Sequence, residues 1–373
     1  MGLFIMLLGA GAVFFIVRAV YRKYWCRGLS IDIRFNSDAA FEGDSASMTE
    51  TIENRSFLPL PFLHAKFEVG SGVSFSSKEN VSTSDQNYKN DLFSVLFFQR
   101  ITRTLSFVCK KRGFYPITSA NLISEDLFFT SHMVAEYPIQ TQFYIYPGHV
   151  DLGPLEDPLR KLMGDMESRT YLYPDPFEFR GIRDYTINDP FNTINWKASA
   201  RSQDLMVNEY GSTVSKEIDI LLNLEDERLI TQPQLQEEAM RIAATLLLRF
   251  LSLGYPVRLI TNGRDQETHE TFSSMQANGP ADRERLLRML SCIDLNLLPD
   301  EFYPYIRAVA QEPDHIRSGY ILISSCMKAP LQEAYRKLSE DAATFWIAPL
   351  YKASDMHLQD IDADEAFFWE VKS

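Results

Sequence analysis

The sequence predicts an α+β multidomain protein with an N-terminal transmembrane helix, an antiparallel β-sandwich and a Rossmann-like α/β domain. This prediction rests on a long apolar run, a set of short alternating strands after it, and strands that alternate with helices further along. The expected divisions are 1–27 for the helix and its basic flank, 28–150 for the sandwich, 151–178 for a connector and 179–373 for the α/β part. A chain of 373 residues can hold two such domains and a short appendage.

The N-terminal segment is predicted to cross a membrane as one helix over residues 3–21. Residues 1–17 carry no charge, and with Ala19–Tyr21 the run approaches the ~20 residues that span a bilayer. A cleaved signal peptide would need a basic segment before the run and a small-residue cleavage site after it, and the sequence has neither. The basic residues follow the apolar run, so the positive-inside rule predicts a single-pass protein of the cell membrane with its bulk in the cytoplasm. These residues are Arg18, Arg22, Lys23 and Arg27.

Alternating polarity predicts the sandwich. Ile31, Ile33 and Phe35 alternate with polar residues, which is typical of a half-buried strand. Residues 70–91 are rich in Ser, Asn, Lys and Gly without a period, and they are expected to form a long surface loop. The connector 151–178 shows no clear element. The strands are predicted at 29–35, 47–55, 62–69, 101–108 and 142–146.

The second half predicts a parallel sheet with helices on both faces. The continuous apolar run at 217–224 is typical of a buried strand, and apolar residues at helical spacing over 235–251 predict a helix that ends at Gly254. Strands and helices then alternate, as in α/β domains. The further strands are predicted at 257–261, 320–324 and 344–349, and the further helices at 283–293, 302–311 and 331–338.

Composition argues against several classes of function. A net charge of −13 with no basic run beyond Lys110–Arg112 disfavours nucleic acid as a partner. The four cysteines lie far apart, which indicates reduced thiols rather than disulfides or a zinc site. The histidines are scattered, and there is no nucleophile elbow or phosphate-binding loop. We therefore expect neither an enzyme nor a resident cofactor.

The stretch 179–201 is the most unusual part of the chain. It holds three arginines, two aspartates, a Trp-Lys pair and several amides around few aliphatic residues, without a helix or strand period. Partly buried charges are costly unless paired, so this composition predicts ionic groups held by hydrogen bonds.

This stretch resembles the signature of the bacterial family called domain of unknown function 58. Weaker matches precede it, at Lys111–Tyr115 and Ile145–Pro147. Two positions depart from the pattern: Asn188 stands where the family usually has Gly, and Asn192 where it usually has Arg. The matching residues are Arg183, Asp184, Tyr185, Asp189, Ile194, Trp196, Lys197, Ser199, Ala200, Arg201, Leu205 and Val207.

The resemblance implies a von Willebrand factor A-like C-terminal domain. In that type of domain an Asp-x-Ser-x-Ser motif after the first strand holds Mg²⁺ through oxygen ligands. The corresponding residues here are Asn223, Glu225 and Glu227, so the motif is degenerate and no metal is expected. The sequence favours a solvated acidic loop, although its carboxylates could still attract a cation.

Two interpretations of the signature stay open. In the architectural one, Arg183, Asp189, Lys197 and Arg201 form ion pairs that fix the segment to the α/β domain, and Trp196 fills a gap. This interpretation requires Trp196 and Arg201 to be largely buried. In the other, Tyr185, Asn192 and the charged groups present a surface to a partner protein, as Tyr, Trp and Arg often do.

The resemblance also implies a function. Members of this family are frequently linked with MoxR-type AAA+ ATPases, so the chain is expected to be a non-enzymatic membrane-anchored adaptor whose partners are such an ATPase and the lipid bilayer. The alternative is a cell-surface receptor that binds a ligand or a cation outside the cell. A hydrolase with an unrecognised site would require a polar pocket that holds an acid or base with a shifted pKa.

Overall fold

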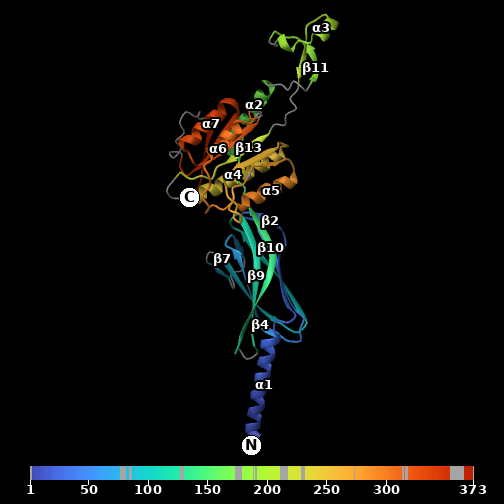
Figure 1. The fold of residues 1–373 in the computed structure, drawn as a ribbon, viewed down its shortest axis with the longest axis vertical. Helices are drawn as coiled ribbons and strands as arrows, with labels where there is room; N and C mark the ends of the chain where they lie inside the picture. Colours follow the sequence, from blue (N-terminus) through green and yellow to red (C-terminus); the bar gives the residue numbers. More distant parts are fainter. Residues whose placement is uncertain are drawn as a thin grey trace. The chain divides into compact units, whose positions relative to one another are not determined.

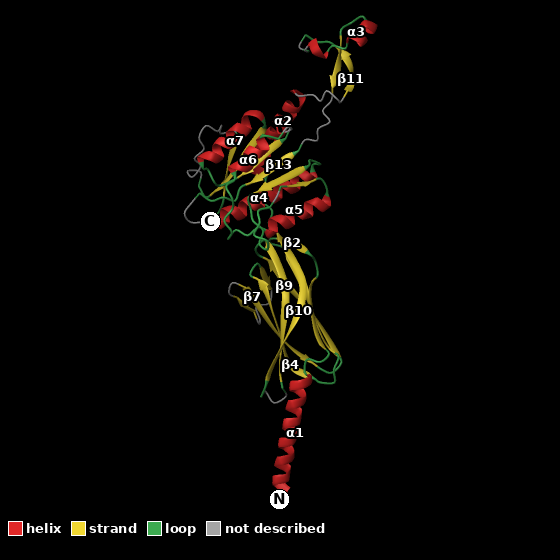
Figure 2. Ribbon diagram, viewed as in Figure 1, coloured by secondary structure: helices red, strands yellow, loops and turns green. Residues whose placement is uncertain are grey.

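The computed structural model is an α+β protein with an N-terminal apolar helix and several β-sheets (Figures 1 and 2). Its contacts divide the chain into two units, Met1–Gly148 and His149–Ser373. The described residues are 2–75, 81–83, 86–126, 130–172, 179–187, 189, 191–210, 217–227, 232–272, 274–312, 315, 318–352 and 365–372.

The first unit begins with helix α1 (Gly2–Tyr24). Among the described residues, this helix alone is long and apolar enough to cross a membrane, a test that a signal sequence near the N-terminus would also pass. The large apolar side chains of its first part are exposed, whereas Tyr21 and the following Trp25 are buried in the core of the β-sandwich. The end of α1 is therefore part of the folded unit.

Two sheets enclose the core of the first unit. The alternation predicted for β1 and β3 is confirmed, because their inward positions, Ile33, Met48 and Ile52 among them, are buried. The pairings are antiparallel except that of β2 with β10. One sheet has the order β1 (Leu29–Phe35), β3 (Ser45–Asn54), β8 (Gln99–Cys109), β5 (Val73–Phe75). The other has the order β2 (Ala39–Phe41), β10 (His132–Tyr146), β9 (Gly113–Glu125), β4 (Leu60–Gly70), β7 (Gln86–Val95), β6 (Val81–Thr83).

The prediction of a long surface loop over residues 70–91 is wrong. This range contains β5, β6 and the first part of β7, while 76–80 and 84–85 lie outside the described residues. β7 escaped recognition because charged residues occupy its inward positions: Lys89 and Asp91 are buried just before Phe93. A pattern based on apolar residues does not register such a strand.

The two buried charged residues of β7, Lys89 and Asp91, lie close to a third charged residue, Arg103 on β8 of the opposite sheet. Lys89 Nζ lies 3.3 Å from Asp91 Oδ1, and Arg103 Nη1 lies 3.3 Å from the same oxygen. Glu50 of β3 is fully buried, and neither of its carboxyl oxygens has a hydrogen-bond partner among the described residues. Burial and the nearby Asp91 raise the pKa of Glu50 to about 8.

The second unit is built on a six-stranded sheet of the order β15-β14-β13-β16-β17-β18. Its pairings are parallel except that of β14 with β15. Helices α6 and α7 pack on one face and α4 on the other (Figure 2). The strands are β13 (Ile218–Leu222), β14 (Val257–Thr261), β15 (Met275–Ala277), β16 (Gly319–Ile323), β17 (Ala343–Leu350) and β18 (Ala366–Glu370). The helices are α4 (Pro233–Ser252), α5 (Pro280–Cys292), α6 (Tyr303–Ala310) and α7 (Ala329–Asp341).

The connector 151–178, in which the sequence shows no clear element, contains a helix, and its residues 173–178 lie outside the described residues. It contains a 3-10 turn, η1 (Gly153–Leu155), followed by helix α2 (Glu156–Leu172), which packs against β16 and β17. Leu159, Leu162 and Met166 are buried at helical spacing. The charged residues between them concealed this narrow apolar stripe in the sequence.

Candidate partner-binding site

The signature folds into a small unit of its own, which we call the signature module and which comprises the described residues between Phe179 and Tyr210. Two antiparallel strands, β11 (Phe179–Asp184) and β12 (Met206–Tyr210), form its base. Between them lie a 3-10 turn, η2 (Phe191–Thr193), and helix α3 (Trp196–Ser202). In chain order the module stands between α2 and β13, which belong to the α/β unit.

Three of the matched signature residues hold the module together. Ile194 and Val207 form a bridge and are both buried. Ser199 Oγ donates to the Asn195 backbone oxygen at 2.9 Å and accepts from the Met206 amide at 2.8 Å. Asn195 Oδ1 also accepts from the Ala198 amide at 2.9 Å, so Asn195 is the N-cap of α3.

A bidentate ion pair closes the turn after β11. Arg183 donates to both carboxyl oxygens of Asp189, with distances of 2.7 and 2.6 Å. Asp189 Oδ2 also accepts from the amide and the hydroxyl of Thr186. These hydrogen bonds hold the pKa of Asp189 well below its usual range, first through Arg183. Asn188, between these partners in the chain, lies outside the described residues.

Trp196 and Arg201 do not take the buried positions that the architectural interpretation requires. Trp196 is 67% exposed, and both Lys197 and Arg201 are exposed. Neither cation has a hydrogen bond or ion pair with another described residue. Helical geometry accounts for the two cations: Ser199 faces the strands, and residues 197 and 201 lie on the opposite side of α3. Trp196 is the first residue of the helix, and its ring is exposed there.

The exposed side of the module is rich in apolar groups. Ile187 is 92% exposed, Phe191 is also exposed, and the rings of Phe191 and Tyr185 lie 6.1 Å apart. Asn192 is exposed as well. Ile182 and Leu205 add further exposed apolar surface. Exposed apolar and aromatic side chains in one small module, together with the exposed cations of α3, are typical of a protein-binding site.

Asn223, one of the predicted residues, joins a polar network at the carboxyl edge of the parallel sheet. Asn223 follows β13, Asn262 follows β14 and Ser324 follows β16. Asn223 donates to Ser324 Oγ at 3.0 Å, and its own oxygen accepts from Asn262 Nδ2 at 3.0 Å. All three are buried, so their amide and hydroxyl groups are used within the protein. Sequence reasoning missed Asn262 and Ser324, although each directly follows a buried strand.

In the acidic loop next to this network, Glu225 departs from the solvated position that we expected, whereas Glu227 does not. Glu225 is buried, and its carboxylate pairs with Lys328 and accepts from the Phe302 amide at 3.3 Å. The hydrogen bond from Lys328 to Glu225 raises the pKa of this lysine. Glu227 is exposed and accepts from the Met327 amide at 3.1 Å. In the part of the chain that the structure describes, no three His, Cys, Asp or Glu residues gather as a metal would require.

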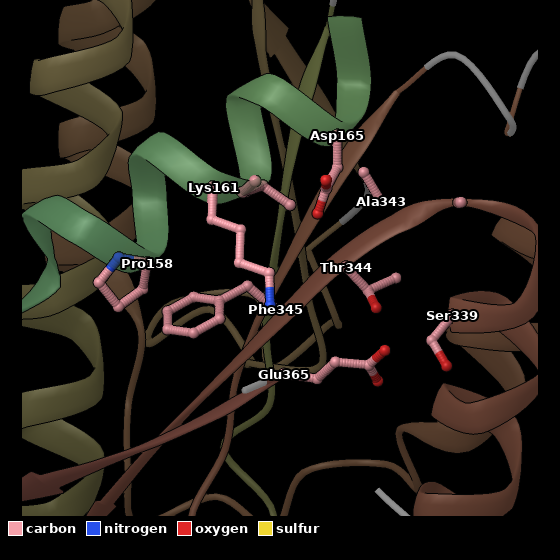
Figure 3. A pocket seen from close by; sticks show the side chains of 10 residues that line it. Pro158, Lys161, Asp165, Ser339, Ala343, Thr344, Phe345 and Glu365 are labelled. Carbon is pink, nitrogen blue, oxygen red and sulfur yellow. The ribbon is translucent and has the colours of Figure 1, made fainter. Parts of the chain in front are cut away.

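A polar pocket lies between α2, the end of α7 and β17 (Figure 3). Its lining includes Lys161 and Asp165 from α2, Thr344 from β17 and the nearby Glu365. Ser339 contributes a hydroxyl that donates to the Arg336 backbone oxygen at 2.9 Å. Its lining residues include no histidine or cysteine.

No family model and no curated protein matches the chain. Among solved structures, a CARDB domain from Pyrococcus furiosus is 13% identical, with 30% of this chain and 93% of that chain covered and a TM-score of 0.20. A non-cellulosomal cohesin from Archaeoglobus fulgidus is 13% identical, with 34% and 96% covered and a TM-score of 0.20. Likenesses this weak support no inference about what the chain does.

Proposed function

We propose that the chain is a non-enzymatic, membrane-anchored adaptor that binds a MoxR-type AAA+ ATPase through the exposed side of the signature module. The observation that carries this proposal is the exposure of Trp196 together with Phe191 and Ile187 on a hydrogen-bonded framework. Exposing these groups to water is unfavourable, and covering them with a partner would recover that free energy. The identity of the partner rests on the family resemblance.

The charged residues of α3 support a partner with an acidic rim. Lys197 and Arg201 are exposed on the same short helix as Trp196, whereas the chain as a whole carries a net charge of −13. Cations that are not engaged within the module can pair with carboxylates of another protein and steer its approach. The proposed ATPase surface is therefore an apolar pocket for Trp196 with acidic side chains around it.

The end of α1 supports retention of the membrane anchor. Tyr21 and Trp25 are buried in the sandwich core, and the Tyr21 hydroxyl donates to the Pro59 backbone oxygen at 2.8 Å. Cleavage of α1 as a signal peptide would remove part of this core. The helix is therefore proposed to remain as a membrane span, with the positive residues that follow it on the cytoplasmic side.

We further propose that the α/β unit is a von Willebrand factor A-like domain without a resident metal. The parallel strands and the position of Asn223 and Glu225 after β13 support this assignment. At the edge where such a domain would place Mg²⁺, Lys328 already supplies a positive charge to Glu225.

Co-purification with the ATPase from membranes, in the presence of ATP, tests the adaptor function. We expect the parent chain to retain the ATPase and Trp196→Ala to retain far less, because a central interface Trp contributes about 2 kcal/mol or more, or roughly 30-fold in affinity. Arg201→Glu should also weaken capture of the ATPase, and this loss should be larger at low salt than at high salt.

Leu298→Ala is the matched control, since Leu298 is also a large exposed side chain of the second unit. It should leave capture unchanged. Equal capture by the parent and Trp196→Ala would contradict the proposed binding surface, and absence of the ATPase from all samples would contradict the proposed partner.

A further inference from the structure

Two neighbouring turns at one end of the β-sandwich present aromatic side chains to the outside. Phe57, between β3 and β4, is 85% exposed. Leu96, Phe97 and Phe98, between β7 and β8, are exposed as well. The rings of Phe57 and Phe98 meet edge to face with centroids 4.6 Å apart. We call these four side chains the loop patch.

The backbone of both turns is fixed by hydrogen bonds. The buried Asn54 donates from its amide nitrogen to the Leu58 oxygen at 2.8 Å and to the Leu96 oxygen at 3.0 Å. The Phe98 amide donates to the Ser56 oxygen at 3.3 Å. Phe98 has a φ of 50°, a left-handed conformation that is unfavourable for a bulky residue. The fold thus holds the aromatic groups outward at a local cost.

The same end of the sandwich contacts the end of α1 (Figure 1). The Tyr21 hydroxyl donates to the Pro59 oxygen at 2.8 Å, and the Arg55 amide donates to the Gly28 oxygen at 2.8 Å. Arg18 Nε donates to Ser131 Oγ at 3.1 Å, in the segment that leads into β10. The turn that carries Phe57 is therefore adjacent to the final turns of the apolar helix.

These contacts place the turns at a defined level along α1. Val17 is the last residue of the uncharged run and is packed against the sandwich core, while Arg18 and Arg22 begin the charged part. In a membrane-spanning helix, the change from apolar to charged residues marks the boundary between hydrocarbon and headgroups. The turn that carries Phe57 contacts Tyr21 through Pro59, so it must lie close to the headgroup layer.

The surroundings of the loop patch suit a lipid surface. Arg55 and Arg100 flank the two turns and share one carboxylate, that of Glu53, at 3.0 Å each. Two cations with one anion leave a positive balance that anionic headgroups can neutralise. Aromatic side chains with nearby Arg are the groups that proteins place in the interfacial layer of a bilayer.

We propose that the loop patch inserts into the headgroup layer of the membrane that α1 spans, and so gives the β-sandwich a second attachment to the bilayer. This inference rests on the proposed membrane anchorage. The occupant is the lipid surface rather than a protein, because α1 brings the bilayer to these turns. Two attachments restrict the tilt of the sandwich, which a single helix cannot do.

Site-specific fluorescence of the full-length protein in vesicles tests the proposal. An environment-sensitive dye is attached at Phe97→Cys in a Cys26→Ser, Cys292→Ser background, in phosphatidylcholine–phosphatidylglycerol vesicles that contain spin-labelled lipid. We expect a blue-shifted emission that is quenched more by a spin label near the headgroup than by one near the chain end. Unquenched, water-like emission from this site would overturn the proposal.

Two further labelling positions separate this inference from the anchorage on which it rests. A dye at Val13→Cys should be quenched most by deep spin labels. A dye at Lys110→Cys should not be quenched, since Lys110 follows the far end of β8, about 33 Å from Gln99 along the strand.

Quenching at Val13 without quenching at Phe97 would overturn the loop patch alone. Lack of quenching at Val13 would overturn the anchorage and this inference with it. A blue shift at Phe97 without lipid quenching would show that protein covers the patch, which also overturns a lipid occupant.

Discussion

Arg258 holds two carboxylates at once in the α/β unit. It donates to both oxygens of Asp219, its register partner on the neighbouring strand, and to both oxygens of Glu312. Asp219 is fully buried on the central strand β13. The hydrogen bond to Asp219 raises the pKa of Arg258 above its already high value, so its charge is permanent. The burial of Asp219 is tolerated because of this partner.

Arg258→Met should therefore lower the stability of the α/β unit by about 3–5 kcal/mol, because it leaves a carboxylate buried without its counterion. Thermal unfolding followed by circular dichroism measures the effect. The double variant Asp219→Leu, Arg258→Met should recover most of the loss, since an apolar pair needs no counterion. A double variant as unstable as the single one would contradict this explanation.

Glu50 represents the opposite case, a buried acid without a hydrogen bond. Its pKa of about 8 means that it carries a proton in the folded protein at neutral pH. The folded state thus binds more protons than the unfolded state at pH values between about 4.5 and 8. Stability contributed by the neutral acid is present below this window and is lost as the pH rises through it.

Glu50→Gln should flatten this pH dependence and raise the melting temperature of the sandwich at pH 8. A single group contributes at most about 1.4 kcal/mol per pH unit within the window. Melting curves between pH 5 and pH 9 provide the measurement, with Glu68→Gln as the control because Glu68 is exposed on β4. A parent protein whose stability does not change across this range would refute the assignment.

At the scale of elements, the signature module separates residues that build it from residues that it displays. Ile194→Ala should destabilise the module by about 2–5 kcal/mol, because Ile194 is buried against β12. Trp196→Ala should change its stability by no more than about 0.5 kcal/mol, as is usual for an exposed site. Limited proteolysis within residues 179–210 reports both effects. Equal protease sensitivity of the two variants would return Trp196 to an architectural role.

The carboxyl edge of the sheet gives a second prediction at this scale. Because Asn223, Asn262 and Ser324 satisfy one another and Lys328 neutralises Glu225, Mg²⁺ should bind weakly or not at all. Calorimetric titration of the purified protein measures this. A stoichiometric site tighter than about 0.1 mM, lost in Glu225→Ala, would contradict the prediction.

Elements with a wide apolar face or an apolar run were predictable from the sequence, and those with charged residues at or beside their inward positions were not. Helix α4 was found because its buried positions repeat at helical spacing. Strand β13 was found because four of its five residues are apolar, with Asp219 as the exception. β7 and α2 were missed because charged residues occupy or surround their inward positions. The exposure of Trp196 was not predictable, because at the first residue of a seven-residue helix the helical period does not decide whether a side chain is covered.

At the scale of the whole molecule, the orientation in the membrane decides between an adaptor and a receptor. A thiol at Leu298→Cys should resist a membrane-impermeant maleimide on intact cells and react after permeabilisation, because the basic residues after α1 favour the cytoplasm. Leu298 is well exposed, so slow reaction cannot result from burial. Ready labelling of intact cells would favour the receptor, with the second unit outside the cell.

The pairing of Phe179 with Tyr210 has a consequence for how the module is joined to the rest of the chain. Opposed residues of an antiparallel pair lie about 5 Å apart, so the first and last residues of the module are close together in space. The described elements on either side are α2, which contacts β16 and β17, and β13, which contacts β14 and β16. The module is in this sense a cassette: residues 179–210 form one continuous segment whose two ends lie side by side.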